Sequence, residues 1–301
     1  MAITISPLNT LIKDFQGILL DAAGVFWGGS AYGLLPGAKE AMEKLMLENK
    51  IVGILSNSAG IASGIQKALA SHGLLQGKHF HFLLTSGEVL HQILVKKQLP
   101  FPSPKKSYYL FGEAHPTYPS HMDLFRDTLY KKVSTIEEAD FLYPSIPHIL
   151  GEDQTDPEVF RKDLQQLLTS PNKPPLVCSN PDHFAHEGSP PRLVVRQGSL
   201  AALYQEMGGT VFFVGKPHEV VYAAAMGLFG QHGIKEPAQV LMIGDTPETD
   251  IHGANTFGMA SALVLQTGIA AERISQVGLQ TFLLSLHKKD TPNYYIERLT
   301  L

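Results

Sequence analysis

Short apolar runs of strand length alternate along this chain with segments whose apolar residues recur at helical spacing. Six runs have the length and composition of buried strands: residues 17–20 (GILL), 51–55 (IVGIL), 82–85 (FLLT), 211–214 (VFFV), 240–243 (VLMI) and 262–265 (ALVL). The alternation of such runs with amphipathic segments is typical of α/β proteins. It predicts a doubly wound parallel sheet with helices on both faces.

Two of the intervening segments, residues 36–49 and residues 216–233, are the clearest helices. Each carries one apolar stripe that we expect to face the core. The first starts at Pro36, and its stripe consists of Ala38, Ala41, Met42 and Leu45. The second ends near Gly233, and its stripe consists of Val221, Ala224, Ala225 and Leu228.

The pattern changes between about residue 101 and residue 195. Prolines cluster at both edges, in LPFPSPKK and in TSPNKPPLVCSNPDHFAHEGSPPR, as expected of linkers and loops. Strand-like runs (SYYLFG, ADFLYP and PLVCS) and a helical segment near DPEVFRKDLQQLLTS lie between these edges. Because 301 residues exceed the usual size of a single core, we predict a discontinuous core domain, residues 1–100 and 196–301, and an inserted α/β domain, residues 101–195.

Composition and charge narrow the class of partner. A formal charge of −4 without a dense Lys/Arg run gives no general attraction for nucleic acid or acidic membranes. The single cysteine, Cys178, excludes an intrachain disulfide, and no apolar run reaches the length of a membrane span. With no signal-peptide pattern at the N-terminus, we expect a cytoplasmic protein that binds a small molecule. The apolar C-terminal segment PNYYIERLTL packs either on the core or on a second subunit of a homo-oligomer.

Polar residues follow four of the predicted strands, and the carboxyl ends of parallel strands meet at one ligand-binding edge of a sheet. They are Asp21, then Ser56 and Asn57, then Lys216, and finally Asp245 and Asp250. Each alone is explained as a cap or turn residue, but together they suit phosphoryl transfer. Asp21 would attack phosphorus as a carboxylate nucleophile, and the later carboxylates would hold Mg²⁺. The remaining three residues would bind the phosphoryl oxygens.

In this order the residues resemble the four motifs of the haloacid dehalogenase (HAD) superfamily. Asp21 matches the nucleophile, Ser56 the second motif, Lys216 the third, and Asp245 with Asp250 the acidic fourth. The long insertion between the second and third motifs resembles the class IIA branch, which includes nucleotide, sugar-phosphate and pyridoxal-phosphate phosphatases. So do TSGEV at 85–89, SNPD at 179–182 and VGKP at 214–217.

The resemblance implies a Rossmann-like core, an inserted cap domain that carries specificity, and Mg²⁺ as the cofactor. The metal would be held by Asp21, by Asp245, by the backbone carbonyl of residue 23, and by Asp250 either directly or from behind the other ligands. In the cap, the SNPD loop with Asn180, Asp182 and His183 is the candidate substrate contact, although these residues equally suit an ordinary loop.

The sequence departs from this family at residue 23. Phosphatases of the superfamily usually carry there a second Asp that serves as general acid and base, whereas this chain has Ala23. General acid catalysis contributes roughly 10²–10⁴ in rate, so we expect slow turnover, least impaired for good leaving groups. One alternative is a catalytically silent protein that binds phosphate esters. Another is a carbon–phosphorus hydrolase resembling phosphonoacetaldehyde hydrolases, whose first motif also carries alanine but whose cap lies between the first and second motifs.

Overall fold

The computed structural model describes residues 4–29, 32–117, 120–187 and 192–301. The chain forms two compact units, each with its own sheet. The first unit is drawn from Met1–Ser56, Ser63–Leu84 and Lys216–Leu301, and the second from Asn57–Ala62 and Thr85–Gly215. Among the described residues, no helix is both long and apolar enough to cross a membrane.

The first unit contains a six-stranded sheet in the order β15-β14-β13-β1-β2-β3. The pairings from β15 across to β2 are parallel, with Leu20 of β1 level with Ile54 of β2 and Ile243 of β13. The strands are β1 (Gly17–Leu20), β2 (Ile51–Ser56), β3 (Phe82–Thr85), β13 (Val240–Gly244), β14 (Ala260–Val264) and β15 (Tyr294–Ile296).

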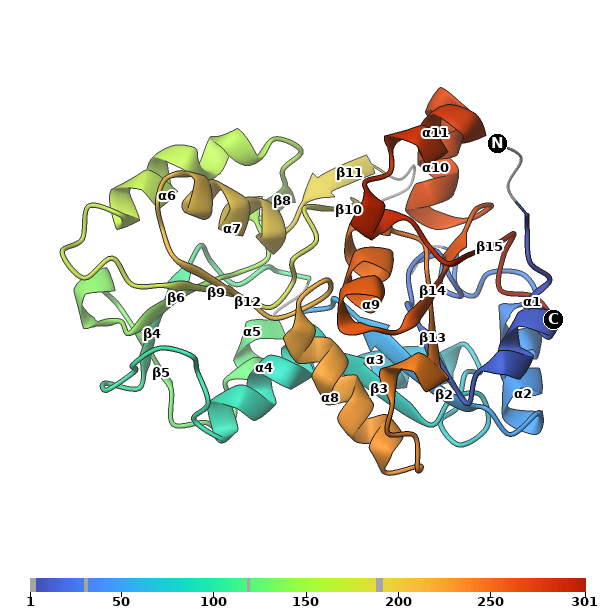
Figure 1. Cartoon of the computed structure of the whole chain (residues 1–301). Coiled ribbons are helices and arrows are strands. Elements are labelled where there is room, and N and C mark those ends of the chain that lie inside the picture. The colour runs from blue at the N-terminus through green and yellow to red at the C-terminus, as the bar shows by residue number, and fades with distance from the viewer. Residues whose placement is uncertain (1–3, 30–31, 118–119, 188–191) are drawn as a thin grey trace. The chain divides into compact units, whose positions relative to one another are not determined.

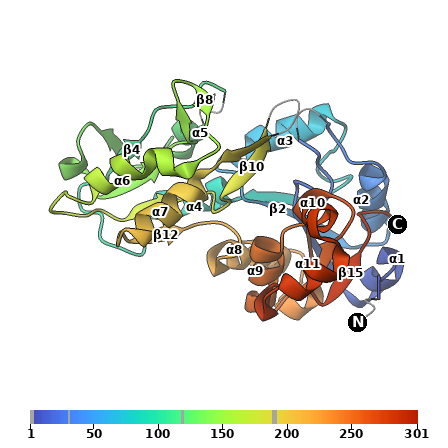
Figure 2. The ribbon, with the colours of Figure 1, turned by 90° about the horizontal axis from the view of Figure 1, so that it is seen from above.

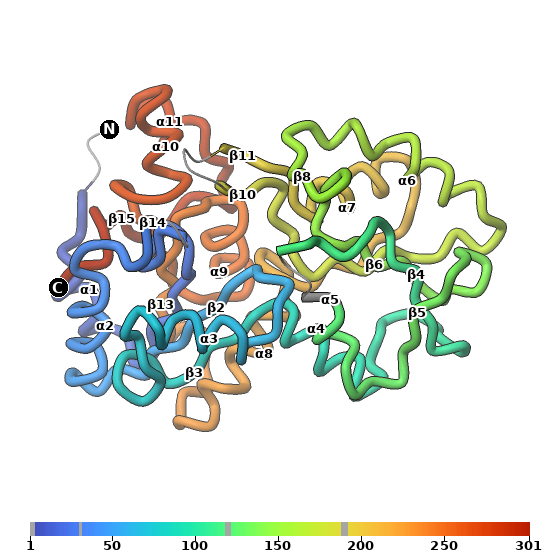
Figure 3. The backbone as a smooth tube through the Cα atoms, turned by 180° about the vertical axis from the view of Figure 1, so that it is seen from behind, coloured from blue at the N-terminus to red at the C-terminus, as the bar shows by residue number. Residues whose placement is uncertain are grey.

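Helices cover both faces of this sheet, with α1, α2 and α3 on one side and α8 and α9 on the other (Figures 1, 2 and 3). The α-helices of the unit are α1 (Leu8–Leu11), α2 (Ala38–Leu47), α3 (Ala62–Ser71), α8 (Glu219–Gly230), α9 (His252–Phe257), α10 (Gly268–Val277) and α11 (Leu279–Ser285). Its single turns are η1 (Ile12–Asp14), η4 (Pro237–Gln239), η5 (Pro247–Ile251) and η6 (Lys288–Asp290). The doubly wound α/β fold predicted from the sequence is therefore confirmed.

The second unit is built on a five-stranded parallel sheet in the order β12-β9-β6-β4-β5. Its strands are β4 (Ser107–Phe111), β5 (Lys131–Val133), β6 (Phe141–Pro144), β9 (Leu176–Cys178) and β12 (Val211–Phe213). Two hairpins accompany it, β7 (His148–Ile149) with β8 (Glu152–Asp153), and β10 (Phe184–Glu187) with β11 (Arg192–Val195). Its helices are α4 (Ser86–Val95), α5 (Ser120–Leu124), η2 (Ile136–Glu138), η3 (Pro157–Phe160), α6 (Arg161–Leu167) and α7 (Gln197–Glu206).

The strand 211–214 was wrongly expected in the main sheet. The structure pairs β12 with β9 at the edge of the second sheet. An apolar run reports burial and not the partner strand, so the pattern did not distinguish the two sheets. The second unit also extends beyond the predicted range 101–195, since α4, α7 and β12 belong to it.

The helical stripes are nearly as expected. In α2 the buried residues are the four predicted ones, Ala38, Ala41, Met42 and Leu45. In α8 the buried residues are Val221, Tyr222, Ala225 and Phe229, while Ala224 and Leu228 are only half-buried. Phe229 packs edge-to-face on Phe82, with 4.9 Å between ring centroids. The buried face of α8 is therefore shifted from the predicted stripe toward the side on which its large aromatic residues lie.

The C-terminal segment packs on the chain's own core. Its residues Tyr294–Ile296 form β15, which extends the main sheet beside β14, and Ile296 and Leu299 are buried. Tyr295 is also bridged by Ile5 near the other end of the chain, and Ser6 N donates to the Tyr295 carbonyl at 2.8 Å. Of the two expected packing sites for this segment, its own core is the one observed.

The TSGEV segment secures the loop that follows β2. Thr85 caps α4 by accepting from Glu88 N at 2.9 Å, and its hydroxyl donates to the Gly60 carbonyl at 2.6 Å. The Glu88 carboxylate accepts from Ala62 N at 3.3 Å. A Cβ on Gly87 would overlap with the Ala59 carbonyl oxygen. This close backbone approach explains why Asn57–Ala62 belongs to the second unit.

Replacement of Gly87 by alanine should therefore destabilise the protein by about 1–3 kcal/mol, because backbone atoms must shift to admit the methyl group. Gly64 is a matched control, since it lies within α3 with nothing inside 4 Å of its added Cβ. Gly64→Ala should raise the free energy of unfolding by up to about 1 kcal/mol through helix propensity. Urea denaturation of both variants measures the difference, and equal stabilities would contradict the close packing of α4.

Candidate active site

The register of three neighbouring strands brings polar residues to one edge of the main sheet. Asp21 follows β1 directly, and its backbone N–H donates to the Ile243 carbonyl at 2.9 Å. Because Leu20 is level with Ile54 and Ile243, Ser56 and Asp245 each follow two residues past that level on the flanking strands. Three of the residues selected from the sequence therefore meet at the carboxyl edge, where open α/β sheets bind ligands.

Lys216 reaches the same edge by another route. It begins the return of the chain into the first unit after β12, and its side chain is buried to all but 2% of its surface. Its ammonium forms an ion pair with Oδ1 of Asp21 and a second with Oδ1 of Asp250 at 2.7 Å. The lysine thus links the nucleophile candidate to the fourth-motif loop.

Asp250 organises the loop that carries Asp245. Its Oδ2 accepts from the backbone N–H groups of Asp245 and Thr246, both at 3.1 Å. Tyr222 of α8 also contacts this loop, since its hydroxyl lies 3.2 Å from the carbonyl oxygens of Thr249 and Asp250. Asp250 therefore engages protein groups through both of its oxygens, which suits a residue that positions its neighbours.

Asp245 is held from the opposite side by the segment after β14. Its Oδ2 accepts from Ile269 N at 2.7 Å, and its Oδ1 accepts from the Thr246 hydroxyl at 2.9 Å. Gly24 and Gly268, with φ of 74° and 69°, approach so closely that a Cβ on either would overlap with the Asp245 carboxylate. Only glycine combines this left-handed backbone with the absence of a side chain. The two glycines therefore shape the pocket around Asp245.

The three carboxylates lie within 4.8 Å of one another and are buried. Burial raises the pKa of Asp21 to about 7, and the nearby Asp250 adds to this while Lys216 opposes it. Burial and the other two carboxylates also raise the pKa of Asp245 well above its ordinary value. The carboxylates of Asp21 and Asp250 overcome the effect of burial on Lys216 and raise its pKa, so this side chain stays an ammonium.

This charge distribution fits a divalent cation. When all three carboxylates are ionised beside one ammonium, the cluster has a formal excess of two negative charges in a buried setting. An uncompensated buried charge is costly, and carboxylate oxygens are the ligands that Mg²⁺ prefers. The residues present therefore match such an ion in both charge and donor type.

Ala23 occupies the turn beyond Asp21, and it is exposed. Gly24 N donates to the Trp27 carbonyl at 2.9 Å, and the Gly24 carbonyl accepts from the Thr267 hydroxyl at 2.5 Å. Trp27 itself is half-buried against the main core and stacks edge-on with His72, with 4.7 Å between ring centroids. The turn is thus fixed at Gly24, directly after the exposed Ala23.

Asn57 and the SNPD loop meet within the second unit. Asn57 donates through Nδ2 to Oδ1 of Asp182 at 2.8 Å, and its Oδ1 accepts from the Ser86 hydroxyl at 3.2 Å. Asn180 Oδ1 accepts from Asp182 N at 3.0 Å. Asn57, Asn180 and Asp182 therefore have side chains engaged in the second unit, whereas the His183 side chain is exposed.

The segment Thr267–Ile269 was not among the site residues predicted from the sequence. These residues follow β14, one of the predicted strands, and they contribute the hydroxyl, the glycine and the N–H described above. The signal was present as a Thr-Gly pair just beyond the apolar run 262–265. It was missed because Gly268 and Ile269 approach Asp245 through their backbone, which residue type alone does not reveal.

Known proteins resemble this chain in sequence. A family model described as HAD-hydrolase-like matches residues 213–299, which include Lys216, Asp245 and Asp250. Human chronophin is 27% identical over 306 residues, covering 97% of this chain and 93% of its own. The sugar-phosphatase AraL of Bacillus subtilis is 27% identical over 259 residues, covering 85% of each chain.

Solved structures share the fold over nearly the whole chain. A haloacid dehalogenase-like hydrolase from Brucella suis superposes with a TM-score of 0.76 at 21% identity, covering 98% of this chain and 99% of its own. A glycerol phosphate phosphatase from Mycobacterium tuberculosis in complex with magnesium superposes with a TM-score of 0.66 at 19% identity, covering 96% of this chain and 76% of its own. Together the match over residues 213–299 and the full-length similarity to chronophin indicate a hydrolase similar to the class IIA phosphatases of the haloacid dehalogenase superfamily.

Proposed function

We propose that this protein is a Mg²⁺-dependent phosphatase or phosphotransferase for a small phosphorylated metabolite, with Asp21 as the nucleophile. The observation that carries the proposal is the buried cluster in which Lys216 pairs with Asp21 while Asp245 and Asp250 supply further negative charge. Asp21, Asp245 and the Ala23 carbonyl would hold the ion, with Asp250 as a ligand or behind the ligands. Bound Mg²⁺ would neutralise the carboxylates enough for an anionic phosphate to approach.

In this scheme the Asp21 carboxylate attacks phosphorus, and the ester oxygen departs with the bonding pair to leave an aspartyl phosphate. Water then releases phosphate and restores the carboxylate. Lys216, the Ser56 hydroxyl and the N–H of Asn57 would bind the phosphoryl oxygens. The second unit would act as the cap domain, with Asn180, Asp182 and His183 near the substrate, and His183 is the one of these three whose side chain is exposed.

Phosphate release from p-nitrophenyl phosphate and from a panel of alkyl phosphates tests the proposal directly. We expect Mg²⁺-dependent turnover that favours the aryl ester by roughly 10²-fold or more, because its leaving group needs no general acid. Asp21→Asn should abolish the activity. Activity that survives in this variant would remove Asp21 from the role of nucleophile.

Replacement of Ala23 by Asp would supply the missing general acid and tests the role proposed for this position. Since Ala23 is exposed, its replacement by Asp should fold normally and accelerate alkyl phosphate hydrolysis by about 10²-fold or more, with a smaller gain for p-nitrophenyl phosphate. Ala23→Asn has nearly the same shape without the proton donor and should give no gain. Steady-state kcat for both substrate classes measures the effect, and unchanged rates in Ala23→Asp would contradict the proposed role.

Thermal and denaturant unfolding test the metal site without activity. At about 100 times its dissociation constant, Mg²⁺ should stabilise the protein by about 2.7 kcal/mol through mass action. Asp245→Asn should lose most of this gain, because one of the buried carboxylates is gone. Glu248→Gln is the control, since Glu248 lies in the same loop but pairs with Arg273 at the surface. Equal stabilisation of the two variants would place the metal elsewhere.

A catalytically silent phosphate-ester-binding protein is the second candidate, and Ala23 is the observation that favours it. In that case the wild-type protein would bind Mg²⁺ and inorganic phosphate tightly but release no phosphate from any ester. The lysine and the carboxylates would then serve to hold a ligand.

A further inference from the structure

The second unit contains a groove of about 710 Å³ on its own sheet. Its lining residues lie between Tyr109 and Leu200, all within the second unit, and include none of the carboxylate cluster described above. The volume falls within the range of roughly 300–1,000 Å³ that small-molecule sites occupy. The groove is therefore a candidate site separate from the phosphate chemistry.

The sheet topology explains the position of the groove. Because the strand order is β5-β4-β6-β9-β12, the chain runs from β4 outward to β5 and then returns past β4 to β6. Open α/β sheets of this order bind ligands where the direction reverses, outside the carboxyl ends of the two central strands. The groove is lined by Gly112 and Glu113 after β4 and by Ser145 and Pro147 after β6. It thus lies at the switch point of the second sheet.

A short crossover leaves this position unfilled. Between β5 and β6 the chain forms only the single turn η2, so this crossover contributes no α-helix above β4. Ile136 of this turn and Leu167 of α6 pack on the core of the second unit and line the two sides of the groove. Buried Phe111, Phe160 and Leu200 line it from below. The result is an apolar floor with aromatic rings.

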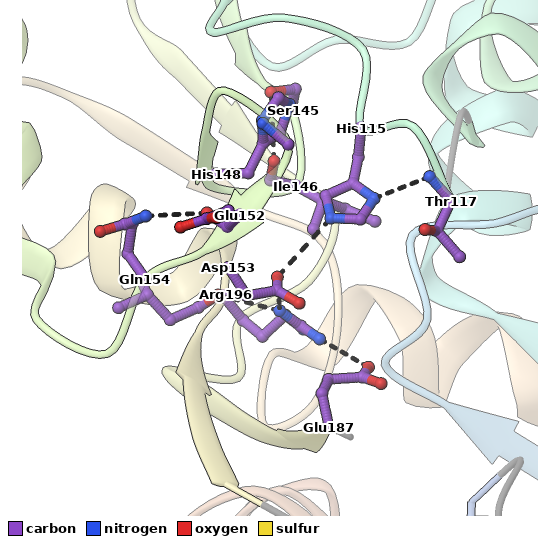
Figure 4. Close-up of polar contacts among 12 residues, drawn as sticks. His115, Thr117, Ser145, Ile146, His148, Glu152, Asp153, Gln154, Glu187 and Arg196 are labelled. Atoms are coloured by element: carbon purple, nitrogen blue, oxygen red, sulfur yellow. Dashed lines mark hydrogen bonds and ion pairs between the residues drawn. The ribbon is translucent and has the colours of Figure 1, made fainter. Parts of the chain in front are cut away.

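A network of polar contacts holds the loop Pro147–Leu150 that lines one side of the groove (Figure 4). His148 accepts from Gly151 N at 3.0 Å and packs edge-on against His115, with 5.0 Å between ring centroids. Asp153 of the same hairpin lies 3.6 Å from His115 Nε2 and accepts from the buried Arg196 at 3.3 Å. Arg196 also donates to Glu187 at 2.6 Å. The loop is thereby preorganised, which lowers the cost of binding.

The charges around the groove have one sign. Its lining includes the exposed carboxylates Glu113, Glu137 and Asp163, and no lysine or arginine among the described residues. Lys105 lies nearby, where its ammonium donates to the Glu137 carbonyl at 2.7 Å, but it does not line the groove. The buried hydroxyl of Ser170 also lines it and has no hydrogen-bond partner among the described residues.

We propose that the groove is a second ligand site, specific for a small organic ammonium ion with an aromatic or other apolar body. The apolar body lies on the floor of Phe111, Phe160 and Leu200, where burial of apolar surface is favourable. The ammonium lies at the rim beside Glu113, Glu137 and Asp163, and aromatic ring faces add to its attraction. An anion of the same size is disfavoured, because it meets only carboxylates.

Three ligands that differ mainly in charge test the proposal: 2-phenylethylamine (cation), 2-phenylethanol (neutral) and 3-phenylpropionate (anion). Binding to the full chain is measured by calorimetry and by NMR shift changes, with Mg²⁺ and inorganic phosphate present to occupy the carboxylate cluster. We expect the amine to bind several-fold more tightly than the alcohol, and the propionate not to bind measurably. Equal affinities for the three ligands, or no binding of the amine, would overturn the proposal.

Variants locate the site. Glu137→Gln and Asp163→Asn should each weaken amine binding by about two- to fivefold, as expected for exposed ion pairs, and leave binding of the alcohol unchanged. Glu138→Gln is the matched control, because Glu138 is the next exposed carboxylate of η2 and does not line the groove. Thr135→Trp should fill the groove from its exposed rim and abolish binding of both ligands. Amine affinity that is equal in Glu137→Gln and Glu138→Gln, or that survives Thr135→Trp, would assign the binding to another surface.

Discussion

The first unit depends on one buried ammonium. Lys216 Nζ lies between Asp21 and Asp250, and both carboxylates are buried close to the third carboxylate, that of Asp245. Removing one partner from a buried pair typically costs about 3–5 kcal/mol, because the remaining charge is left uncompensated. The lysine therefore ties the turn after β1 to the loop after β13, and the geometry of the whole site follows from this constraint.

The same arrangement separates positioning from chemistry. One carboxylate oxygen of Asp250 pairs with Lys216, and the other accepts hydrogen bonds from two backbone N–H groups. The main effect of Asp250 is therefore to hold the loop that carries Asp245. Burial raises the pKa values of Asp21 and Asp245, and the neighbouring carboxylates raise them further. Perturbed carboxylates of this kind cluster at functional sites. Under the proposed function, Ala23 would leave the site without a proton donor at this position, and charge compensation would then dominate its chemistry.

The second unit repeats the same architectural principle on a smaller scale. Each unit has a parallel sheet whose strand order reverses direction, and each places polar residues after the strands next to that reversal. In the main sheet these residues are an acidic cluster with one lysine. In the second sheet they surround an apolar groove with an acidic rim and a fixed wall around His148 and Arg196. Under the two proposals, the first site would bind an anionic phosphate through Mg²⁺ and Lys216, whereas the second would bind an organic cation directly at its carboxylates.

Local pattern determined the secondary structure and the positions of Asp21, Ser56, Asp245 and Asp250 after their strands, because periodicity and strand ends are read over a few neighbouring residues. It also indicated the family, since the motifs occur in order. Only the tertiary structure decided that 211–213 belongs to the second sheet, that Asn57 binds Asp182, and that Thr267–Ile269 enclose Asp245. Those outcomes depend on which strand edges pair and how closely backbones approach. Such contacts join residues far apart in the chain, and an apolar run or a loop residue has the same local sequence whichever partner it meets.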